Sequence, residues 1–381
     1  MTLRNLRAGL IGTGFIGPVH AEALARLGIR LTAICGSVRG SAALAKRYGV
    51  EEVFDDYDAA SLVRSPKVDV VHVTSPNRFH HAQALSALRA GKHCVCEKPL
   101  ALTTRETAEL VAAARKSRRV LAVSYNVRFY PAVLKMRRMV ARGDLGRIVH
   151  VHGSYFQDWL LKDTDYNWRL LPAEGGKLRA VADIGTHWID TVSFILDSRV
   201  RELLADLGLL HKTRQRPLGE IQTFAKSGPR ARTASFRVAT EDFASILLGF
   251  AGGVRGTLGV SQVAAGRKNS IRIEIYGSER SAGWSSEEQE TLVVGSRDGA
   301  NEVIVRASEA FGVDAAPFVD YPAGHVEGFP DTFKMLFRNV YSHIAGEKAE
   351  RLYATAEDGH EEVKVCEAVL RSHASRAWVK V

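Results

Sequence analysis

The sequence predicts two domains: an α/β domain with a doubly wound parallel sheet over residues 1–125, then an α+β domain with a large, mostly antiparallel open sheet over residues 126–381. Strand-like and helix-like segments alternate in the first third of the chain, which is typical of a parallel sheet with helices on both faces. After Tyr125 this alternation gives way to runs of strands. At 381 residues, the chain also exceeds what one hydrophobic core normally supports.

The first strand and helix enclose a glycine-rich turn. Gly12, Gly14 and Gly17 form the pattern G-x-G-x-x-G directly after an apolar run, and Phe15 and Ile16 complete the turn as predicted cofactor contacts. In a dinucleotide-binding turn, the first glycine permits the tight turn and the second lets the backbone approach a pyrophosphate. The third lets the helix pack close to the strand, with its N-terminus toward the phosphates. An ordinary tight turn of another α/β domain is the alternative.

The other elements of the first domain follow from apolar runs separated by helical periodicity. Strands are expected at residues 31–35, 68–74, 93–96 and 120–124, and helices at residues 41–48, 81–90 and 105–116. Thr103 supplies a plausible N-cap for the last of these helices.

The second domain begins with a predicted helix at residues 131–142 and a half-buried strand in GRIVHVHGSYF. An irregular aromatic stretch and a helix at about residues 181–196 follow. Strands are expected at residues 244–263, 270–276, 292–294 and 303–305, with Gly252-Gly253 as a hairpin turn signal, and helices at residues 330–345 and 358–373.

Bulk composition excludes several classes of protein. The chain is 46% hydrophobic, yet no apolar run approaches the ~20 residues that span a bilayer, and the N-terminus has no signal-peptide pattern. The four cysteines are too few and too scattered for a disulfide framework, which fits a cytoplasmic protein, and we expect Cys94 and Cys96 to be buried thiols because their spacing does not suit zinc. The net charge of +10 is spread along the chain without aromatic interleaving, so we expect no nucleic-acid partner.

The end of the second strand bears on the choice of nicotinamide cofactor. NAD-binding turns place an acidic residue about twenty residues past the glycines, to accept from the ribose 2′-hydroxyl. Here no Asp or Glu occurs between Glu22 and Glu51, and Ser37 and Arg39 follow the strand instead. A hydroxyl and a cation suit a 2′-phosphate, so NADP is favoured over NAD. The alternative is that Arg39 lies on a solvated loop.

Two later strand ends carry polar residues where ligands of open α/β sheets bind. Ser75, Pro76 and Asn77 follow the third strand, with His80 three residues on. The next strand ends in CVCEKPLA, so the charged residues Glu97 and Lys98 come directly after an apolar run. A lysine near a core suits proton handling, because partial desolvation tunes its charge. The alternatives are a helix-capping role for His80 and an ordinary surface position for Lys98.

The segment AVADIGTHWIDTVSFIL places Asp183 and His187 four residues apart, on one side of a helix, and Asp190 continues that face. A histidine positioned by a carboxylate is a good general acid or base near neutral pH. The alternative is a surface pair on the helix. A metal site is not predicted, because a third ligand at recognisable spacing is missing.

Taken together, GTGFIG, SPNRFH, EKPLA, YNVRF and the GG before DIGTHWID resemble the Gfo/Idh/MocA family over essentially the whole chain. This resemblance implies a Rossmann domain followed by an α+β domain whose open sheet supports homodimers or homotetramers. It implies catalytic roles for Lys98, Asp183 and His187. It also implies nicotinamide-side contacts for Asn77, His80 and Glu97. Lys98 and Asn126 are predicted cofactor contacts as well.

The expected reaction is hydride transfer between a nicotinamide and a secondary hydroxyl or ketone of a cyclic sugar, glycoside or inositol. Sugars need aromatic platforms and polar partners, and the predicted substrate contacts are Lys98, Arg128, Tyr155, Gln157, Trp159, Trp168, Arg169, Asp183, His187 and His325, with Asp158 and Tyr276 as further candidates. The alternatives are glycoside processing through transient NAD redox chemistry and a non-catalytic dinucleotide-binding regulator. The stretch GGKLRAVAD is longer than the family's usual GGGxLxD, so the loop before Asp183 is expected to differ.

Overall fold

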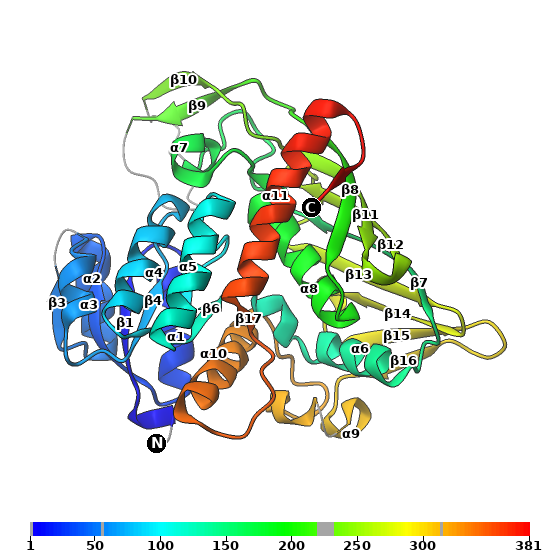
Figure 1. Cartoon of the computed structure of the whole chain (residues 1–381), viewed down its shortest axis with the longest axis horizontal. Helices are drawn as coiled ribbons and strands as arrows, with labels where there is room; N and C mark the ends of the chain where they lie inside the picture. Colours follow the sequence, from blue (N-terminus) through cyan, green and yellow to red (C-terminus); the bar gives the residue numbers. More distant parts are fainter. Residues whose placement is uncertain (1–2, 55–56, 219–231, 313–314) are drawn as a thin grey trace. The chain divides into compact units, whose positions relative to one another are not determined.

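A computed structural model of the chain describes residues 3–54, 57–218, 232–312 and 315–381. The chain divides into two compact units (Figure 1). Unit 1 comprises residues 1–126, 173–176 and 329–363, and unit 2 comprises residues 127–172, 177–328 and 364–381. Within the described residues, no helix is long and apolar enough to cross a membrane.

Unit 1 is built on a seven-stranded sheet in the order β17-β6-β5-β4-β1-β2-β3. The six strands β1 to β6 are parallel, and β17 pairs antiparallel with β6. The strands are β1 (Arg7–Ile11), β2 (Arg30–Cys35), β3 (Glu52–Phe54), β4 (Val70–Val73), β5 (His93–Cys96), β6 (Leu121–Val123) and β17 (Ala354–Thr355). The helices are α1 (Ile16–Arg26), α2 (Val38–Tyr48), α3 (Ala59–Arg64), α4 (His80–Arg89), α5 (Thr104–Ser117) and α10 (Phe329–Ala345).

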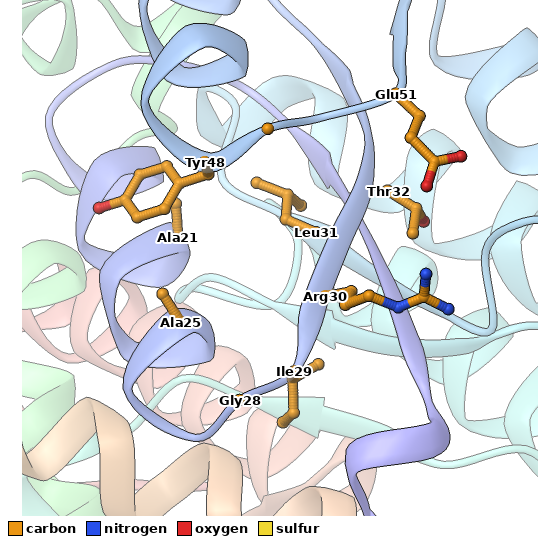
Figure 2. Close-up of a pocket in the computed structure, with 10 residues that line it drawn as sticks. Ala21, Ala25, Gly28, Ile29, Arg30, Leu31, Thr32, Tyr48 and Glu51 are labelled. Carbon is orange, nitrogen blue, oxygen red and sulfur yellow. The ribbon is translucent and has the colours of Figure 1, made fainter.

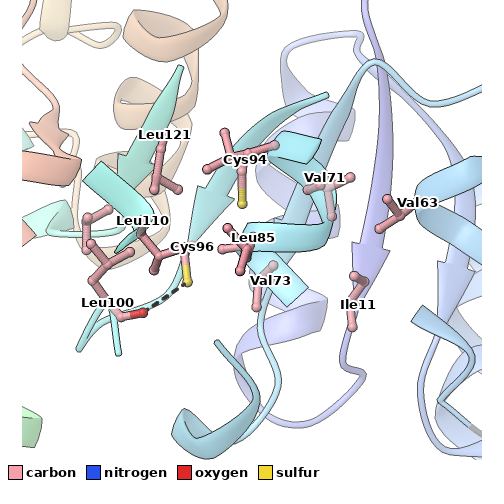
Figure 3. Close-up of a cluster of buried hydrophobic side chains, with 14 of the residues drawn as sticks. Ile11, Val63, Val71, Val73, Leu85, Cys94, Cys96, Leu100, Leu110 and Leu121 are labelled. Carbon is pink, nitrogen blue, oxygen red and sulfur yellow. Dashed lines mark hydrogen bonds between the residues drawn. The ribbon is translucent and has the colours of Figure 1, made fainter. Parts of the chain in front are cut away.

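Successive residues of a strand face opposite sides of a sheet, and β4 shows this clearly. Val71 and Val73 lie in the hydrophobic cluster that includes Leu85 of α4 and Leu110 of α5 (Figure 3). His72 points to the other face, where it contacts side chains of α1 and α10. The sheet is therefore covered by helices on both faces, as the predicted doubly wound fold requires.

Unit 2 is built on a nine-stranded sheet in the order β16-β15-β14-β13-β7-β12-β11-β8-β18. Neighbouring strands of this sheet pair antiparallel, except β7 and β12, which are parallel. The strands are β7 (Ile148–Phe156), β8 (Val200–Gly208), β11 (Phe243–Phe250), β12 (Arg255–Ser261), β13 (Ser270–Gly277), β14 (Arg280–Ser285), β15 (Thr291–Ser296), β16 (Glu302–Val305) and β18 (Val379–Lys380). A separate ribbon joins β9 (Thr213–Pro217) to β10 (Thr233–Arg237).

Helices α6 (Pro131–Arg142) and α8 (Thr186–Leu196) pack on one face of this sheet. Trp188 of α8 is fully buried, and its indole N–H donates to the carbonyl of Arg272 on β13. Gly153 of β7 leaves the room for this indole, because a Cβ there would lie 2.3 Å from the ring nitrogen. The apolar side of α8 therefore packs inward. Short helices α7 (Pro172–Gly175) and α9 (Ser308–Phe311) and the long α11 (Ala356–Ser375) complete the chain.

The domain ranges need one correction. The predicted second domain runs through residues 126–381 without a break, but residues 329–363 belong to unit 1. Helix α10 packs against α1, and β17 adds an antiparallel edge strand beside β6. Both segments are too far from the Rossmann motifs in sequence for local patterns to assign them. The short elements β3 and α3 and the strands β8, β9, β10 and β14 were also missing from the prediction.

Candidate functional site

The glycine-rich turn of unit 1 has the geometry of a dinucleotide-binding turn. Gly12 has a φ of +104°, and a Cβ on it would lie 2.6 Å from the backbone of Thr74. A Cβ on Gly17 would lie 2.3 Å from the carbonyl oxygen of Gly12, so helix α1 packs directly on the turn. Gly14 is different, because a Cβ on it would meet nothing within 4 Å. This open position lets a ligand approach the backbone, as a pyrophosphate requires.

The turn after β2 is shorter than expected. Helix α2 begins at Val38 rather than at residue 41, with Ser37 as its N-cap, accepting from the backbone N–H of Gly40. Arg39 is therefore an exposed residue in the first turn of a helix and not part of a solvated loop. Gly36 is wedged against Thr13, since a Cβ would lie 2.6 Å from the Thr13 hydroxyl. The glycine-rich turn and the start of α2 are thus adjacent.

The segment after β4 uses its polar groups to hold the backbone. Ser75 donates its hydroxyl to Gln83, and Asn77 donates its side-chain amide to the carbonyl of Gly175. His80 is buried, and its two ring nitrogens lie 2.8 and 2.9 Å from the carbonyls of Pro99 and Ser75. Burial lowers the pKa of His80, although both carbonyls favour a protonated ring. His80 therefore ties the β4 and β5 strand ends together. This is not the helix-capping role considered as the alternative, because Phe79 is the N-cap of α4 and no side-chain hydrogen bond caps that helix.

Glu97 and Lys98 follow β5 at the carboxyl edge of the parallel sheet, and the Lys98–Pro99 peptide is cis. The Glu97 carboxylate is almost buried. One oxygen lies 3.1 Å from Nε2 of His20, and the other accepts from the backbone N–H of Lys98 at 3.3 Å. Because the glycine-rich turn follows β1 in the same parallel sheet, the turn and these two residues lie at one edge.

In unit 2, Asp183 lies in a π-helical turn, Val181–Gly185, that leads directly into α8. Its two carboxylate oxygens have different partners. Oδ1 forms an ion pair with Nε of Arg169 at 3.0 Å, and Oδ2 accepts from Nε2 of Gln262 at 2.8 Å. Two donors, one of them charged, favour the ionised form of this carboxylate. The side chain of Arg169 therefore binds the carboxylate of Asp183. The spacing of residues in the sequence did not indicate this contact.

A second layer holds this carboxylate in place. Gln262 accepts from Arg179 at 3.3 Å, and the buried Arg179 and Arg214 share the carboxylate of Asp242. Glu241 accepts the backbone N–H groups of Arg179 and Val181 at the start of the π turn, and burial raises the pKa of Glu241 to about 7. Sequence reasoning missed these residues, because only the pairing of β11 and β12 brings residues 241, 242 and 262 to this helix.

His187 follows one helical turn after Asp183 and is 8% exposed. Its ring lies 6.1 Å from the ring of Tyr155, centroid to centroid. The Tyr155 hydroxyl donates to Asn269 at 2.7 Å, which also receives the amide of Gln157, and Gln157 in turn accepts from the indole of Trp159. The predicted substrate contacts Tyr155, Gln157 and Trp159 therefore form one hydrogen-bonded row, with Asn269 as a member that the sequence did not indicate.

Arg128 corrects one of the predicted substrate contacts. Its side chain is 7% exposed and forms a bidentate ion pair with the buried Asp190, at 2.8 and 2.5 Å. The guanidinium also lies over the ring of Phe194. Arg128 therefore joins the segment after Asn126 to helix α8 and is not open to substrate. For the same reason Asp190 does not continue an open Asp183–His187 face, since it faces the interior.

The remaining candidates are divided between the units. Asn126, a predicted cofactor contact, donates its amide to Thr332 within unit 1. In unit 2, Trp168 lies against the guanidinium of Arg169. His325 lies on an exposed loop, where its backbone carbonyl accepts a hydrogen bond from Arg306. No cluster of three metal-ligating side chains occurs in the described part of the chain.

A small cleft on unit 1 is not the nucleotide site. It has a volume of about 280 Å³. The residues that line it (Figure 2) are Ala21, Ala25, Gly28, Ile29, Arg30, Leu31, Thr32, Tyr48, Gly49 and Glu51. Arg30 and Leu31 begin strand β2, whereas the glycine-rich turn follows the end of the parallel strand β1. The cleft lies at the amino ends of the parallel strands, and the glycine-rich turn lies at their carboxyl ends.

Comparison with known proteins agrees with this geometry. A family model described as "Oxidoreductase family, NAD-binding Rossmann fold" matches residues 6–125, and one described as "GFO/IDH/MocA C-terminal domain" matches residues 133–282. The chain belongs to the Gfo/Idh/MocA family. Membership confirms the predicted family, the fold class and the class of enzyme, an oxidoreductase with a nicotinamide dinucleotide.

Individual members of the Gfo/Idh/MocA family match along the whole chain. Levoglucosan dehydrogenase of Pseudarthrobacter phenanthrenivorans is 29% identical over 100% of this chain and 99% of its own. An oxidoreductase domain protein from Kribbella flavida is 30% identical, with a TM-score of 0.85 and full coverage of both chains. A levoglucosan dehydrogenase solved with NADH and L-sorbose is 26% identical, with a TM-score of 0.87, over 99% of this chain and 98% of that one.

Proposed function

We propose that this protein is a dehydrogenase that oxidises a secondary hydroxyl of a cyclic sugar, glycoside or inositol, and that it reduces the ketone in reverse. The observation that carries the proposal is the Asp183–His187 segment. Asp183 is held as a carboxylate by Arg169 and Gln262, one helical turn before the buried imidazole of His187. The full-length similarity to levoglucosan dehydrogenase supports the substrate class.

The proposed chemistry divides between the two units. When bound, the nicotinamide dinucleotide accepts the hydride that leaves the hydroxyl-bearing carbon. Gly12, Gly14 and Gly17 would hold its pyrophosphate, and the Glu97–Lys98 strand end would hold its nicotinamide half. His187 takes the hydroxyl proton on a ring nitrogen. For Lys98 we propose a hydrogen bond to the substrate, and Asp183 supports the positive charge that develops on His187.

The sugar is recognised by the row of Tyr155, Gln157, Trp159 and Asn269. The row joins aromatic surfaces to polar atoms, and both are needed for a ring that carries hydroxyls on its edge and C–H groups on its faces. Burial raises the pKa of Tyr155, so its hydroxyl stays protonated and donates throughout the physiological range.

For the cofactor, we propose a preference for NADP over NAD. The supporting features are the missing acid after β2 and the exposed Arg39 in the first turn of α2. A helix N-terminus and a guanidinium both favour a 2′-phosphate.

We also propose that the protein is a cytoplasmic homodimer or homotetramer associated through the sheet of unit 2. One face of that sheet exposes apolar side chains on three strands: Phe243, Leu247, Val293, Val303 and Val305. Replacing Leu247 with Asp is expected to reduce the mass measured by analytical ultracentrifugation. An unchanged mass would place the interface elsewhere.

A substrate panel tests the proposal. Sugars, glycosides and inositols are offered with NAD and with NADP, and absorbance of reduced nicotinamide is followed. His187→Ala is expected to lower turnover by ~10²–10⁴-fold while cofactor affinity stays within a factor of two or so. His81→Ala, which changes a surface histidine paired with Glu109, is the matched control. Full activity of His187→Ala would overturn the assignment.

A further inference from the structure

A chain of buried polar side chains runs through unit 1 and ends at Glu97. His20 on α1, His72 on β4 and Tyr341 on α10 are each fully buried. Tyr341 Oη lies 2.9 Å from Nε2 of His72, Nδ1 of His72 lies 3.0 Å from Nδ1 of His20, and Nε2 of His20 lies 3.1 Å from Oε1 of Glu97. The mechanism above uses none of the first three residues.

The two histidines of this chain can be oriented in only two ways if both are neutral. Each ring then carries one N–H and one acceptor nitrogen, so each hydrogen bond fixes the direction of the next. In the first arrangement every donor points toward Glu97, which accepts as a carboxylate. In the second every donor points toward Tyr341, and Glu97 itself carries a proton. Burial keeps the pKa of His72 far below its ordinary value, so this ring is neutral in either case.

Tyr341 decides between the two arrangements. Among the described residues, His72 is the hydrogen-bond partner of the Tyr341 hydroxyl. In the second arrangement this oxygen accepts from His72, and its own hydrogen is left without an acceptor in a fully buried position. A buried donor without a partner is costly, whereas in the first arrangement every polar hydrogen of the chain is used.

We propose that Tyr341, acting through His72 and His20, is a positioning residue that keeps Glu97 ionised and oriented at the nicotinamide end of the sheet. The neutral pattern is Tyr341 O–H to His72 Nε2, then His72 Nδ1–H to His20 Nδ1, then His20 Nε2–H to Glu97. The rings of Phe333 and Phe337 lie against His20, and Phe337 also lies against His72. These rings shield the series Tyr341–His72–His20–Glu97, here called the relay, from water.

The surroundings of Glu97 contain other charged or titratable groups. Its own strand end contributes Lys98 and the neutral thiol of Cys96, and α4 contributes His80, whose pKa is lowered by burial. These groups stay the same when Tyr341 is changed, so the relay can be tested separately. The titratable or charged groups near Glu97 and the relay are therefore His20, His72, His80, Cys96, Lys98 and Tyr341. The charge of Asp69 contributes to the raised pKa of Tyr341.

The first experiment reads the tautomers directly and needs no substrate. In protein labelled with ¹⁵N-histidine, two-bond ¹⁵N–¹H correlations identify the protonated nitrogen of each ring, and His20→Asn and His72→Asn assign the signals. The expected result is His20 protonated on Nε2 and His72 protonated on Nδ1. The reverse tautomers, or a charged His20, would overturn the proposal even if dehydrogenase activity is intact.

The second experiment reads the consequence for Glu97, whose place at the nicotinamide end rests on the proposed function. Tyr341→Phe keeps the ring but removes the terminal donor, so the pKa of the Glu97 carboxyl, followed by NMR in ¹³C-glutamate-labelled protein and assigned with Glu97→Gln, is expected to rise by about one unit. Tyr353→Phe is the matched control, because it removes another buried hydroxyl of unit 1 that bonds to a histidine, His343. An unmoved Glu97 pKa in a Tyr341→Phe protein with native near-ultraviolet circular dichroism would contradict the proposal.

Discussion

The Nε atom of Arg169 lies 3.0 Å from Oδ1 of Asp183, and the two side chains are 23% and 13% exposed. A half-enclosed ion pair of this kind is screened by solvent less than a surface pair, so it keeps a substantial part of its strength. The pair fixes both the charge and the orientation of the carboxylate that precedes His187. It also explains why Arg169, in the short 3-10 helix Trp168–Leu170, matters to a longer helix that follows it in the sequence.

Replacing Arg169 with Met is expected to lower kcat/KM by about 10–100-fold, because a hydrogen bond to a charged group contributes about 1.5–3 kcal/mol. Steady-state kinetics with the substrate found in the panel would measure it. Arg267→Met, which breaks an exposed pair with Glu287, is the control and should change little. Equal kinetics for the two variants would remove Arg169 from the site.

Arg128→Met should act on stability instead. The substitution leaves the carboxylate of Asp190 buried without its cation, which typically costs about 3–5 kcal/mol. The denaturation midpoint in urea should fall, while KM for the sugar in the folded protein stays near that of the parent. A raised KM at unchanged stability would restore the role in substrate binding that the sequence first indicated.

Because Glu241 is buried, we expect the stability of the protein to depend on pH. Burial raises its pKa to about 7 in the folded state, against an ordinary value of 4.5. The folded state thus binds the proton more tightly. Its stabilising contribution is complete below about pH 4.5 and is lost as the pH rises through about 7.

Glu241→Gln removes this dependence while keeping an acceptor for the N–H groups of Arg179 and Val181. Between pH 5 and 8, the unfolding free energy of the parent should fall relative to the variant, by roughly 1–3 kcal/mol in all. Denaturant titrations of both proteins at each pH give the difference. Parallel curves across this range would show that Glu241 does not titrate there.

The two glycines of the turn should behave differently on substitution. Gly12→Ala forces a Cβ against the backbone of Thr74 at a positive φ, so the melting temperature should fall. Gly14→Val meets open space, so stability should hold while dinucleotide binding, followed by nicotinamide fluorescence, is lost. Retained binding in Gly14→Val would mean that the pyrophosphate lies elsewhere.

Arg39→Ala tests the cofactor preference. If the guanidinium holds a 2′-phosphate, the Kd for NADP should rise about tenfold or more and that for NAD should stay constant. Arg47→Ala, on the same helix but in its last turn, is the control. The prediction fails if both affinities change together.

Local patterns were sufficient for much of this protein. The glycine spacing, the alternation of strands and helices and the apolar stripe of α8 depend on neighbours in the chain, and they predicted the Rossmann sheet, the turn and the Asp183–His187 helix. Propensity and periodicity act within about one helical turn or one strand, which is why these features could be read from the sequence.

Only the tertiary structure decided what each polar side chain does. Arg128 and Arg169 look alike in the sequence, yet one is paired with a buried carboxylate of the interior and the other with Asp183. Gln262, Glu241 and Tyr341 gain their roles from strand pairing and helix packing across 60 to 269 residues of sequence. Long-range contacts of this kind are set by the packing of the whole core, and a local sequence pattern carries no record of them.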